Sequence, residues 1–170
     1  MNRPTPIKRD KSLLLLSRDH HDGLLVVWKI RQGIRLNIEK ERIADFVINS
    51  FEQKEAPHFS EEEQLLFAKL PVNDEWRLQA ETDHAAIRNA VATLKSGNKI
   101  TIDDLEAFAN MLEAHIRFEE RTLFPHFEKT VSPEVLEETG QLLAADYRNK
   151  TPFVWKDEFW IKPKENAGNR

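Results

Sequence analysis

Two histidine–glutamate pairs with the same spacing, His58-x-x-x-Glu62 and His115-x-x-x-Glu119, constrain this chain more than any other feature. Residues four apart lie one turn apart on the same face of an α-helix, so each pair directs an imidazole and a carboxylate to one side. Both pairs lie in stretches where apolar residues recur with a helical period. The sequence therefore predicts two helices that each present a nitrogen and an oxygen donor on their apolar face.

Helical periodicity extends over most of the chain, and no strand-like alternation persists. Helices are predicted at about residues 12–34, 39–70, 73 or 74–97 and 101–123, and a shorter one at about 133–145. Thr101-x-x-Asp104 is typical of a capping box, and Ser132 before Pro133 is typical of a helix start. Pro57 lies inside the second stretch and predicts a kink one residue before His58.

Short connections between the first four helices favour antiparallel neighbours. We expect an all-α, up-down-up-down antiparallel four-helix bundle in a single domain over residues 1–170, with 40% hydrophobic residues to form its core. The bundle should span about 12–130, the shorter C-terminal helix 133–145 and an extended tail 146–170. Aromatic residues in this tail are expected to pack against the bundle; they are Phe153, Trp155, Phe159 and Trp160.

Composition excludes several kinds of site. The sequence has no cysteine, so disulfides, thiolate ligands and thiol catalysis are ruled out, and a metal must use nitrogen and oxygen donors. A net charge of −4 gives no general attraction to nucleic acid or to a membrane surface. The apolar run after the basic start breaks at Ser17-Arg18-Asp19, too early for an export signal. A cytoplasmic protein without a membrane or nucleic-acid partner is expected.

Two further histidines, His20 and His84, lie on the apolar faces of the first and third predicted helices. In an antiparallel hairpin, two residues at equal depth lie equally far from the turn, so their sequence midpoint falls in the connection. The midpoint of His20 and His58 is residue 39, and that of His58 and His84 is residue 71. The midpoint of His84 and His115 lies between residues 99 and 100. Each falls at the connection of two predicted helices or at its edge, which places the four histidines in one layer.

Six residues thus form a donor set that suits two metal ions: His20, His58, Glu62, His84, His115 and Glu119. Each His-x-x-x-Glu match taken alone is weak, and a lone histidine on an apolar face is more often a hydrogen-bonded core residue than a ligand. Four histidines and two carboxylates in one interior layer favour a metal, because buried charges are normally paired or bound to cations.

Other histidines and acidic residues lie close in sequence to these six and are assigned other positions. His20 shares its apolar stripe with Leu16 and Leu24, so we favour it over His21, which is expected at the periphery. His126 fails the midpoint test and is assigned to the surface. The acidic residues beside Glu62, in the run Glu61–Glu63, are interpreted as solvated helix surface.

The segments that carry these residues resemble the hemerythrin-like, or HHE cation-binding, family over about residues 12–145. They are Leu16-Ser-Arg-Asp-His20, Pro57-His58-Phe-Ser-Glu-Glu62, His84 and His115-Ile-Arg-Phe-Glu119-Glu-Arg-Thr-Leu-Phe-Pro125. The resemblance implies a four-helix bundle with a non-haem di-iron centre. By this analogy His20 and His58 bind one iron, His84 and His115 bind the other, and Glu62 and Glu119 bridge them.

The chain departs from the oxygen-carrying members of that family. They place a second histidine one turn along the third helix, where this chain has Arg88 after His84 and Ala80 before it. They also use a carboxylate five residues after the fourth-helix histidine, so Glu119 and Glu120 are both candidates for the bridge. The reduced histidine content resembles the subgroup linked to iron handling and to sensing or detoxifying oxygen and nitric oxide.

The leading functional hypothesis is a di-iron protein that binds or reduces oxygen, peroxide or nitric oxide in sensing, protection or iron handling. Manganese or zinc would also accept these ligands, because affinity alone does not select among such metals. The alternatives are a metal storage or buffering module, and an interaction module that metal only stabilises. No catalytic residue is assigned, since the chain has no nucleophile–base constellation and no phosphate-binding loop.

Overall fold

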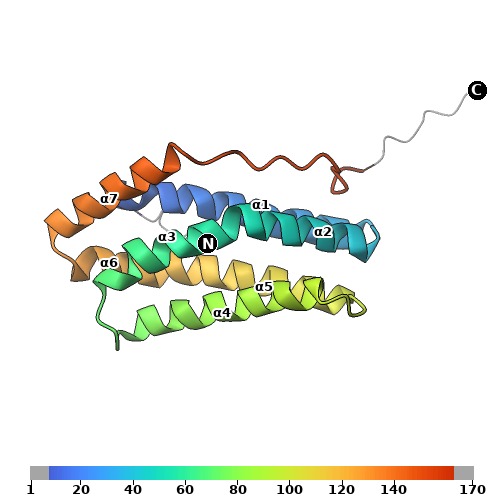
Figure 1. Ribbon diagram of the computed structural model, residues 1–170, viewed down its shortest axis with the longest axis horizontal. Helices are drawn as coiled ribbons and strands as arrows, with labels where there is room; N and C mark the ends of the chain where they lie inside the picture. Colours follow the sequence, from blue (N-terminus) through green and yellow to red (C-terminus); the bar gives the residue numbers. More distant parts are fainter. Residues whose placement is uncertain (1–7, 163–170) are drawn as a thin grey trace, which may run out of the picture.

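The computed structural model describes residues 8–162, and all regular structure within this part of the chain is helical (Figure 1). The α-helices are α1 (Leu14–Arg35), α2 (Lys40–Ser50), α3 (Ala56–Leu65), α4 (Glu75–Lys95), α5 (Ile102–Phe118), α6 (Phe124–Thr130) and α7 (Pro133–Tyr147). Between them lie the 3-10 turns η1 (Lys11–Leu13) and η3 (Phe67–Lys69) and the π-helical turns η2 (Phe51–Glu55) and η4 (Glu119–Leu123). The predicted all-α class is confirmed for these residues. The last part of the predicted tail, from residue 163, lies outside them.

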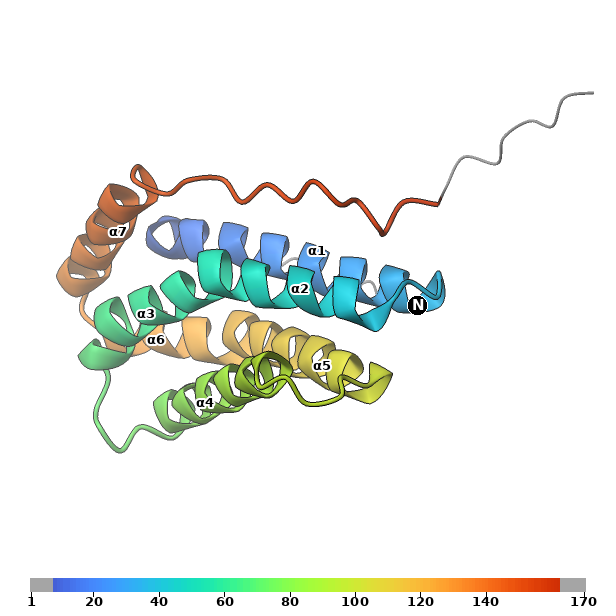
Figure 2. The same ribbon diagram turned by 45° about the vertical axis from the view of Figure 1, so that its right-hand side comes forward.

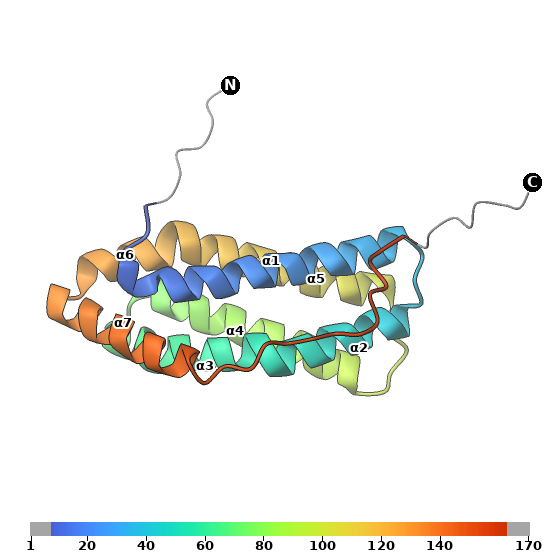
Figure 3. The same cartoon turned by 90° about the horizontal axis from the view of Figure 1, so that it is seen from above.

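Helix α1, the continuous path α2–η2–α3, helix α4 and the path α5–η4–α6 lie lengthwise beside one another (Figures 1 and 3). Helix α5 packs against α1 and α4, and α2 packs against α1, α4 and α5. Helix α7 covers one end, where it contacts η1, α1 and α3 (Figure 2). Among residues 8–162, no helix combines the length and apolar character needed to cross a bilayer.

The helix boundaries follow from local side-chain chemistry. Asp74 caps α4 by accepting hydrogen bonds from the backbone N–H groups of residues 76 and 77. Thr101 and Asp104 form the predicted capping box at the start of α5, and Ser132 caps α7. Gly97, which follows α4, adopts a φ of 75°, a left-handed conformation that glycine reaches without steric cost.

A widened turn of helix accompanies the kink predicted at Pro57, where the path from α2 to α3 changes direction (Figure 1). The π-helical turn η2 ends at Glu55, directly before Ala56 and Pro57, and η4 ends directly before Phe124 and Pro125. Proline has no N–H group, and its ring crowds the carbonyl four residues earlier, so a normal α-helical turn is disfavoured at both points. An extra residue in the turn relieves this crowding, and the helix continues instead of breaking.

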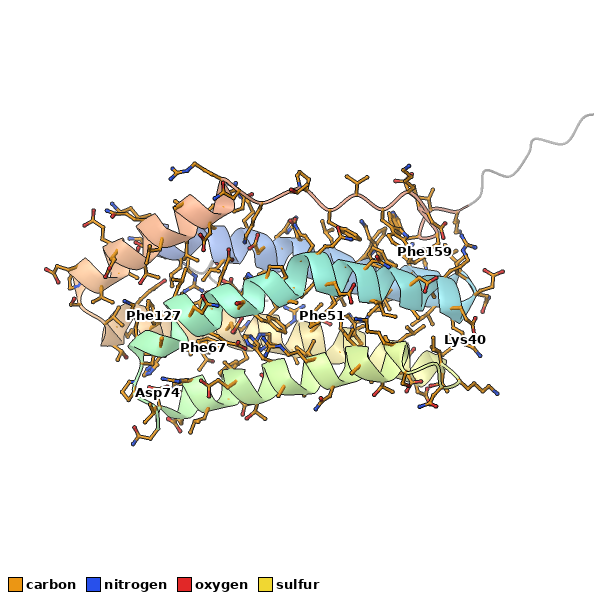
Figure 4. The ribbon with its side chains drawn as sticks, viewed as in Figure 1. Lys40, Phe51, Phe67, Asp74, Phe127 and Phe159 are labelled. Carbon is orange, nitrogen blue, oxygen red and sulfur yellow. The ribbon has the colours of Figure 1, made fainter. Side chains whose placement is uncertain are left out.

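Two apolar clusters lie at opposite ends of the long helices. One contains Phe46, Ile87 and Phe108, and the other contains Phe67 and Phe127. Figure 4 shows Phe67 and Phe127 toward one end of the molecule and Phe159, which belongs to the first cluster, toward the other. Along each long helical path, the predicted donor residues lie where the path passes from one cluster to the other. The polar layer is therefore enclosed by apolar packing on both sides.

The segment after α7 runs in an extended conformation along α3 and α2 (Figure 3). Its four aromatic side chains gather around Phe46, with ring centroids 5.4–6.1 Å from that ring; they are Phe153, Trp155, Phe159 and Trp160. The Arg42 guanidinium of α2 also donates to Asp157, with Nη2 2.7 Å from Oδ1. Aromatic packing and this ion pair together fix the far part of the segment.

Candidate metal centre

The six predicted donor residues converge in the polar layer between the two apolar clusters. They come from four helical paths: His20 from α1, His58 and Glu62 from α3, His84 from α4, His115 from α5, and Glu119 from the first position of η4. All six are buried, and Glu62, His84 and Glu119 have no exposed surface. In Figure 4, side-chain nitrogen atoms gather between the helices in the stretch from Phe67 to Phe51.

The first half of the layer brings two histidines to both carboxylates. Nε2 of His20 lies 3.0 Å from Oε2 of Glu119 and 3.5 Å from Oε1 of Glu62. Nε2 of His58 lies 3.0 Å from the same Oε1 of Glu62. One donor atom from each of these four residues lies within 4.8 Å of the others, which is close enough for one cation to contact all four.

The second half repeats this arrangement with the same two carboxylates. Nε2 of His84 lies 3.3 Å from Oε2 of Glu62, and Nε2 of His115 lies 3.3 Å from Oε2 of Glu119. The two Nε2 atoms are 3.1 Å apart. These four residues again have donor atoms within 4.8 Å of one another. Glu62 and Glu119 are shared by both halves, as bridging ligands of two cations would be.

Each of the four histidines has a further carboxylate at its other ring nitrogen. Nδ1 of His20 lies 2.7 Å from Glu120, and Nδ1 of His84 lies 2.8 Å from Glu63. Nδ1 of His58 lies 3.2 Å from Asp19. The same atom of His115 lies 3.3 Å from Asp83. A carboxylate accepts hydrogen bonds, so the proton of each neutral imidazole belongs on Nδ1, and the Nε2 lone pair is directed into the layer.

These outer carboxylates form a closed ring around the bundle. Helix α1 supplies Asp19 to the histidine of α3, and α3 supplies Glu63 to that of α4. Helix α4 supplies Asp83 to the histidine of α5, and η4 supplies Glu120 to that of α1. Each outer carboxylate is adjacent in sequence to a residue of the inner set. The sequence could therefore have indicated the outer carboxylates by a repeated pattern, in which an acidic residue is adjacent to an inner donor. The four pairs are Asp19-His20, Glu62-Glu63, Asp83-His84 and Glu119-Glu120.

Three of the outer carboxylates, besides contacting a histidine, form an ion pair with a cationic side chain. Arg9 pairs with Glu120, Arg88 pairs with Glu63, and Lys150 pairs with Asp19, all with nitrogen–oxygen distances of 2.7–2.9 Å. Arg9 and Lys150 come from opposite ends of the described chain and lie outside the periodic helices. Sequence periodicity contains no signal for either of them.

The structure corrects two of the assignments made from sequence. Glu61 and Glu63 were expected to be solvated helix surface, but Glu61 pairs with Lys150 at 2.7 Å, and Glu63 contacts both His84 and Arg88. His126 was assigned to the surface, yet it is half-buried, and its Nε2 lies 2.6 Å from Oδ2 of Asp74.

The structure describes the two pairs of adjacent residues between which the sequence left a choice of ligand. His20 is buried in the layer, whereas His21 is exposed on the outer face of α1. Glu119 faces both groups of histidines, whereas Glu120 contacts Nδ1 of His20 from outside. In this geometry Glu119 occupies the bridging position. That any of these residues binds a metal stays a prediction.

The close contacts between histidines and carboxylates shift the pKa values of both kinds of group. Burial alone would lower the pKa of His58, but the negative charge of Glu62 and the contact with Asp19 outweigh it and raise the pKa to about 9. Burial would raise the pKa of Asp19, but the contacts with His58 and Lys150 hold that pKa at about 2. Without a metal, the interior carboxylates are therefore compensated by protonated imidazoles.

A third cluster of potential donors, formed by Asp19, His58 and Glu61, does not suit a metal ion. The ammonium group of Lys150 lies 2.7 Å from both Asp19 and Glu61 and already compensates their charges. A lysine is not expected among the ligands of a cation, because its own positive charge would be repelled.

A cavity of about 340 Å³ leads from the surface to the donor layer, where its lining includes His115 as well as two histidines of the first half. Its outer lining includes the exposed side chains of Gln53 and Thr151, and its inner lining includes the buried His20 and His58. The inner lining also includes the buried Glu55 and four apolar residues: Gly23, Phe59, Leu112 and Ile116. A small molecule can therefore reach the histidines along a partly apolar path.

The inner donor atoms satisfy a direct test for a missing cation. Nε2 of His20, Nε2 of His58 and all four carboxylate oxygens of Glu62 and Glu119 are buried without a hydrogen-bond partner of acceptable geometry. A buried polar atom left without a partner costs about 1–3 kcal/mol, and more when it is charged. Two cations in the layer would satisfy every one of these atoms, so the donor set fits a dinuclear metal site.

Comparison with known proteins agrees with this geometry. The model of the hemerythrin HHE cation-binding domain matches residues 17–127, which include all six donor residues. No curated protein and no solved structure gave a significant match. Since the match covers more than half of the chain, this protein belongs to the hemerythrin HHE cation-binding domain family.

Proposed function

We propose that the protein is an up-down-up-down four-helix bundle that holds two iron ions and binds or reduces a small oxidant. His20 and His58 would hold one ion, and His84 and His115 the other. Glu62 and Glu119 would bridge the two ions. A cytoplasmic location stays a prediction from the sequence.

One observation carries the metal proposal. With the Nδ1 protons held by outer carboxylates, the neutral histidines direct unprotonated Nε2 atoms toward carboxylate oxygens, and in one pair toward each other. Lone pairs and negative charges that face one another in a buried layer repel, because low polarity strengthens their interaction. The layer therefore needs positive charge, supplied either by protonated imidazoles, as in the metal-free protein, or by cations. Two cations turn each of these repulsive contacts into an attractive one.

Iron is the metal we favour within this set of imidazole and carboxylate donors. Manganese and zinc accept the same ligands, so donor type alone does not select the metal. Iron would supply one-electron chemistry toward a bound oxidant. The family membership supports a cation site, and the partly apolar cavity supports access by oxygen, nitric oxide or peroxide.

The side chains around the centre have separate tasks in this proposal. Asp19, Glu63, Asp83 and Glu120 hold the Nδ1 protons and fix the orientation of the imidazoles. Phe59 stacks on His84 with ring centroids 3.8 Å apart and an interplanar angle of 7°, and Phe124 lies parallel to His20 at 5.2 Å. These rings limit imidazole rotation and give the donor layer apolar walls.

The test starts with protein purified without an affinity tag from cells grown with iron. Metal analysis should give two iron ions per chain, and the visible spectrum should show ferric absorption. The reduced protein should then consume hydrogen peroxide or nitric oxide over several turnovers. Reversible iron release without turnover would favour storage, and stable metal without either property would favour a structural role. Protein that holds no metal after iron reconstitution would contradict the proposal.

A further inference from the structure

The extended segment after α7 closes one side of the cavity that leads to the donor layer. Lys150 and Thr151 belong to the cavity lining, together with residues of α1, η2 and α3. Figure 3 shows the segment lying along α3 and then α2. Beyond residue 151 it stays close to the bundle and reaches the aromatic contacts around Phe46. The segment is thus held on both sides of the cavity mouth.

Lys150 holds the segment by ion pairs at the end that is nearer to α7. Its ammonium group donates hydrogen bonds to Oδ2 of Asp19 and to Oε2 of Glu61, both at 2.7 Å. Asp19 belongs to α1 and Glu61 to α3, so one side chain of the segment joins the two helices that carry His20 and His58. Lys150 is 30% exposed, whereas the two carboxylates are only 11% and 12% exposed. Such shielding makes this contact stronger than an ion pair in open solvent.

The same contact reaches the donor layer. The Oδ2 atom of Asp19 that accepts from Lys150 also lies 3.2 Å from Nδ1 of His58. If the ammonium group were absent, Asp19 and Glu61 would face each other as two shielded negative charges. Their repulsion would turn Asp19 away from His58 or separate α1 from α3 at the cavity mouth. No other histidine of the layer has a partner held by this segment among residues 8–162.

We infer that Lys150 is a positioning residue that fastens the C-terminal segment across the cavity mouth and, through Asp19, holds His58 in place. The segment thereby controls access to the cavity, and its hold on an imidazole, through Asp19, is confined to His58 in the His20–His58 half of the layer. The part of this inference that concerns metal access rests on the proposed function. The fastening itself does not, and it can be tested without metal.

The variants are Lys150→Met, which keeps the length of the side chain without its charge, and Lys150→Arg, which keeps the charge and the donors. Lys156→Met is the matched control, because Lys156 is an exposed residue of the same segment and makes no ion pair with residues 8–162. All three proteins are prepared as the full chain, and circular dichroism verifies their helix content. A Lys150→Met protein that lost its helices would be replaced by Lys150→Gln.

The first measurement is hydrogen–deuterium exchange of the metal-free proteins. Lys150→Met should exchange faster than wild type over residues 149–154, while Lys150→Arg and Lys156→Met should resemble wild type. Exchange in α4 and α5 should not change, since the ion pairs of Lys150 are with α1 and α3. Unchanged exchange over 149–154 in Lys150→Met would overturn the inference, whatever the protein binds.

The second measurement uses iron-loaded protein, with azide as the probe ligand. Stopped-flow absorbance should show a several-fold faster association of azide with Lys150→Met than with wild type or Lys156→Met, and Lys150→Arg should restore the slow rate. A ferric chelator should remove one of the two ions several-fold faster from Lys150→Met and leave the loss of the second unchanged. Equal acceleration for both ions would contradict the selective role.

The two proposals can fail separately. Wild-type protein that binds no iron would refute the proposed function, and the exchange experiment would still decide whether Lys150 fastens the segment. Wild-type protein that binds two ions, with the same azide and chelator rates in Lys150→Met, would support the function and refute the control of access.

Discussion

Nε2 of His84 lies 3.1 Å from Nε2 of His115, while Nδ1 of each ring faces a carboxylate. One of the two facing nitrogens could carry a proton only if its ring were imidazolium or gave up its Nδ1 proton to the partner. A cation between the two rings needs neither change, because it accepts both lone pairs. We therefore propose that the two residues are ligands of one cation, and that a protonated ring takes its place in the metal-free protein.

We predict that the protein binds two metal ions per chain and that His58→Ala and His115→Ala each lower this number, because each removes an inner nitrogen donor. Inductively coupled plasma mass spectrometry of iron-reconstituted protein measures the stoichiometry. His21→Ala is the matched control, since His21 is adjacent to His20 but exposed. If His21→Ala lost metal while His20→Ala kept it, the assignment of the α1 ligand would be wrong.

Substitutions of Glu119 and Glu120 should have different effects. Glu119→Gln removes a charge shared by both halves of the layer, so we expect it to lose at least one ion. Glu120→Gln changes the partner of His20 Nδ1 and weakens the pairing with Arg9, but it leaves all inner donors in place, so we expect two ions bound with affinity lowered about 10–100-fold, as is typical for partners of metal-bound histidines. Competition with a chromogenic chelator measures both. The reverse order of effects would identify Glu120 as the bridge.

The inner donor residues could be placed from sequence because the arrangement of a helical bundle depends on periodicity and turn position. The apolar stripes indicate the inward face of each helix, and the midpoints of His20, His58, His84 and His115 place all four at one depth. The structure brings these residues together with Glu62 and Glu119. The hemerythrin family was likewise identified from the same segments, and the family match confirms it.

The outer residues could not be placed in this way. Asp19 and Asp83 lie one position from a histidine, which is about 100° around the helix, so neither belongs to an apolar stripe. Their partners are on neighbouring helices and depend on packing distances that periodicity does not contain. Lys150 comes from a segment without periodicity. The π-helical turns were missed because Pro57 indicates a kink in the helix but not the widened turn that accompanies it.

Glu55 should make the stability of the metal-free protein depend on pH. Burial raises the pKa of this carboxyl group from 4.5 to about 7. Below pH 4.5 both folded and unfolded chains hold the proton, so the group has no net effect. As the pH rises from 4.5 to 7, the unfolded chain releases the proton more readily, and the folded state loses up to about 3 kcal/mol of stability. Above pH 7 this loss is constant.

Glu55→Gln removes the ionisable group at nearly constant volume, so it should stabilise the metal-free protein at pH 8 and have little effect at pH 4.5. Urea unfolding followed by circular dichroism at both pH values measures the difference. Glu106→Gln, an exposed substitution on α5, should leave the stability nearly equal to that of wild type at both. A Glu55→Gln gain that was the same at pH 4.5 and pH 8 would show that ionisation of Glu55 is not its cause.

Metal removal should lower the melting temperature by many degrees. Glu62 and Glu119 are fully buried, and without cations they depend on protonated imidazoles for compensation. A metal that binds only the folded state stabilises it in proportion to the logarithm of its free concentration over its dissociation constant. Differential scanning calorimetry of the iron-loaded and chelator-treated proteins measures this shift. The His58→Ala protein should gain less on iron addition than wild type, because it lacks one inner donor.

Most helix content should nevertheless survive metal removal at room temperature. The apolar clusters around Phe46 and Phe67 lie on opposite sides of the donor layer and do not depend on it for their packing. Far-ultraviolet circular dichroism of the chelator-treated protein should therefore stay close to that of the loaded form. Loss of most helical signal would mean that the layer, and not the clusters, holds the helices together. Identical melting temperatures with and without iron would instead contradict a metal site in the interior.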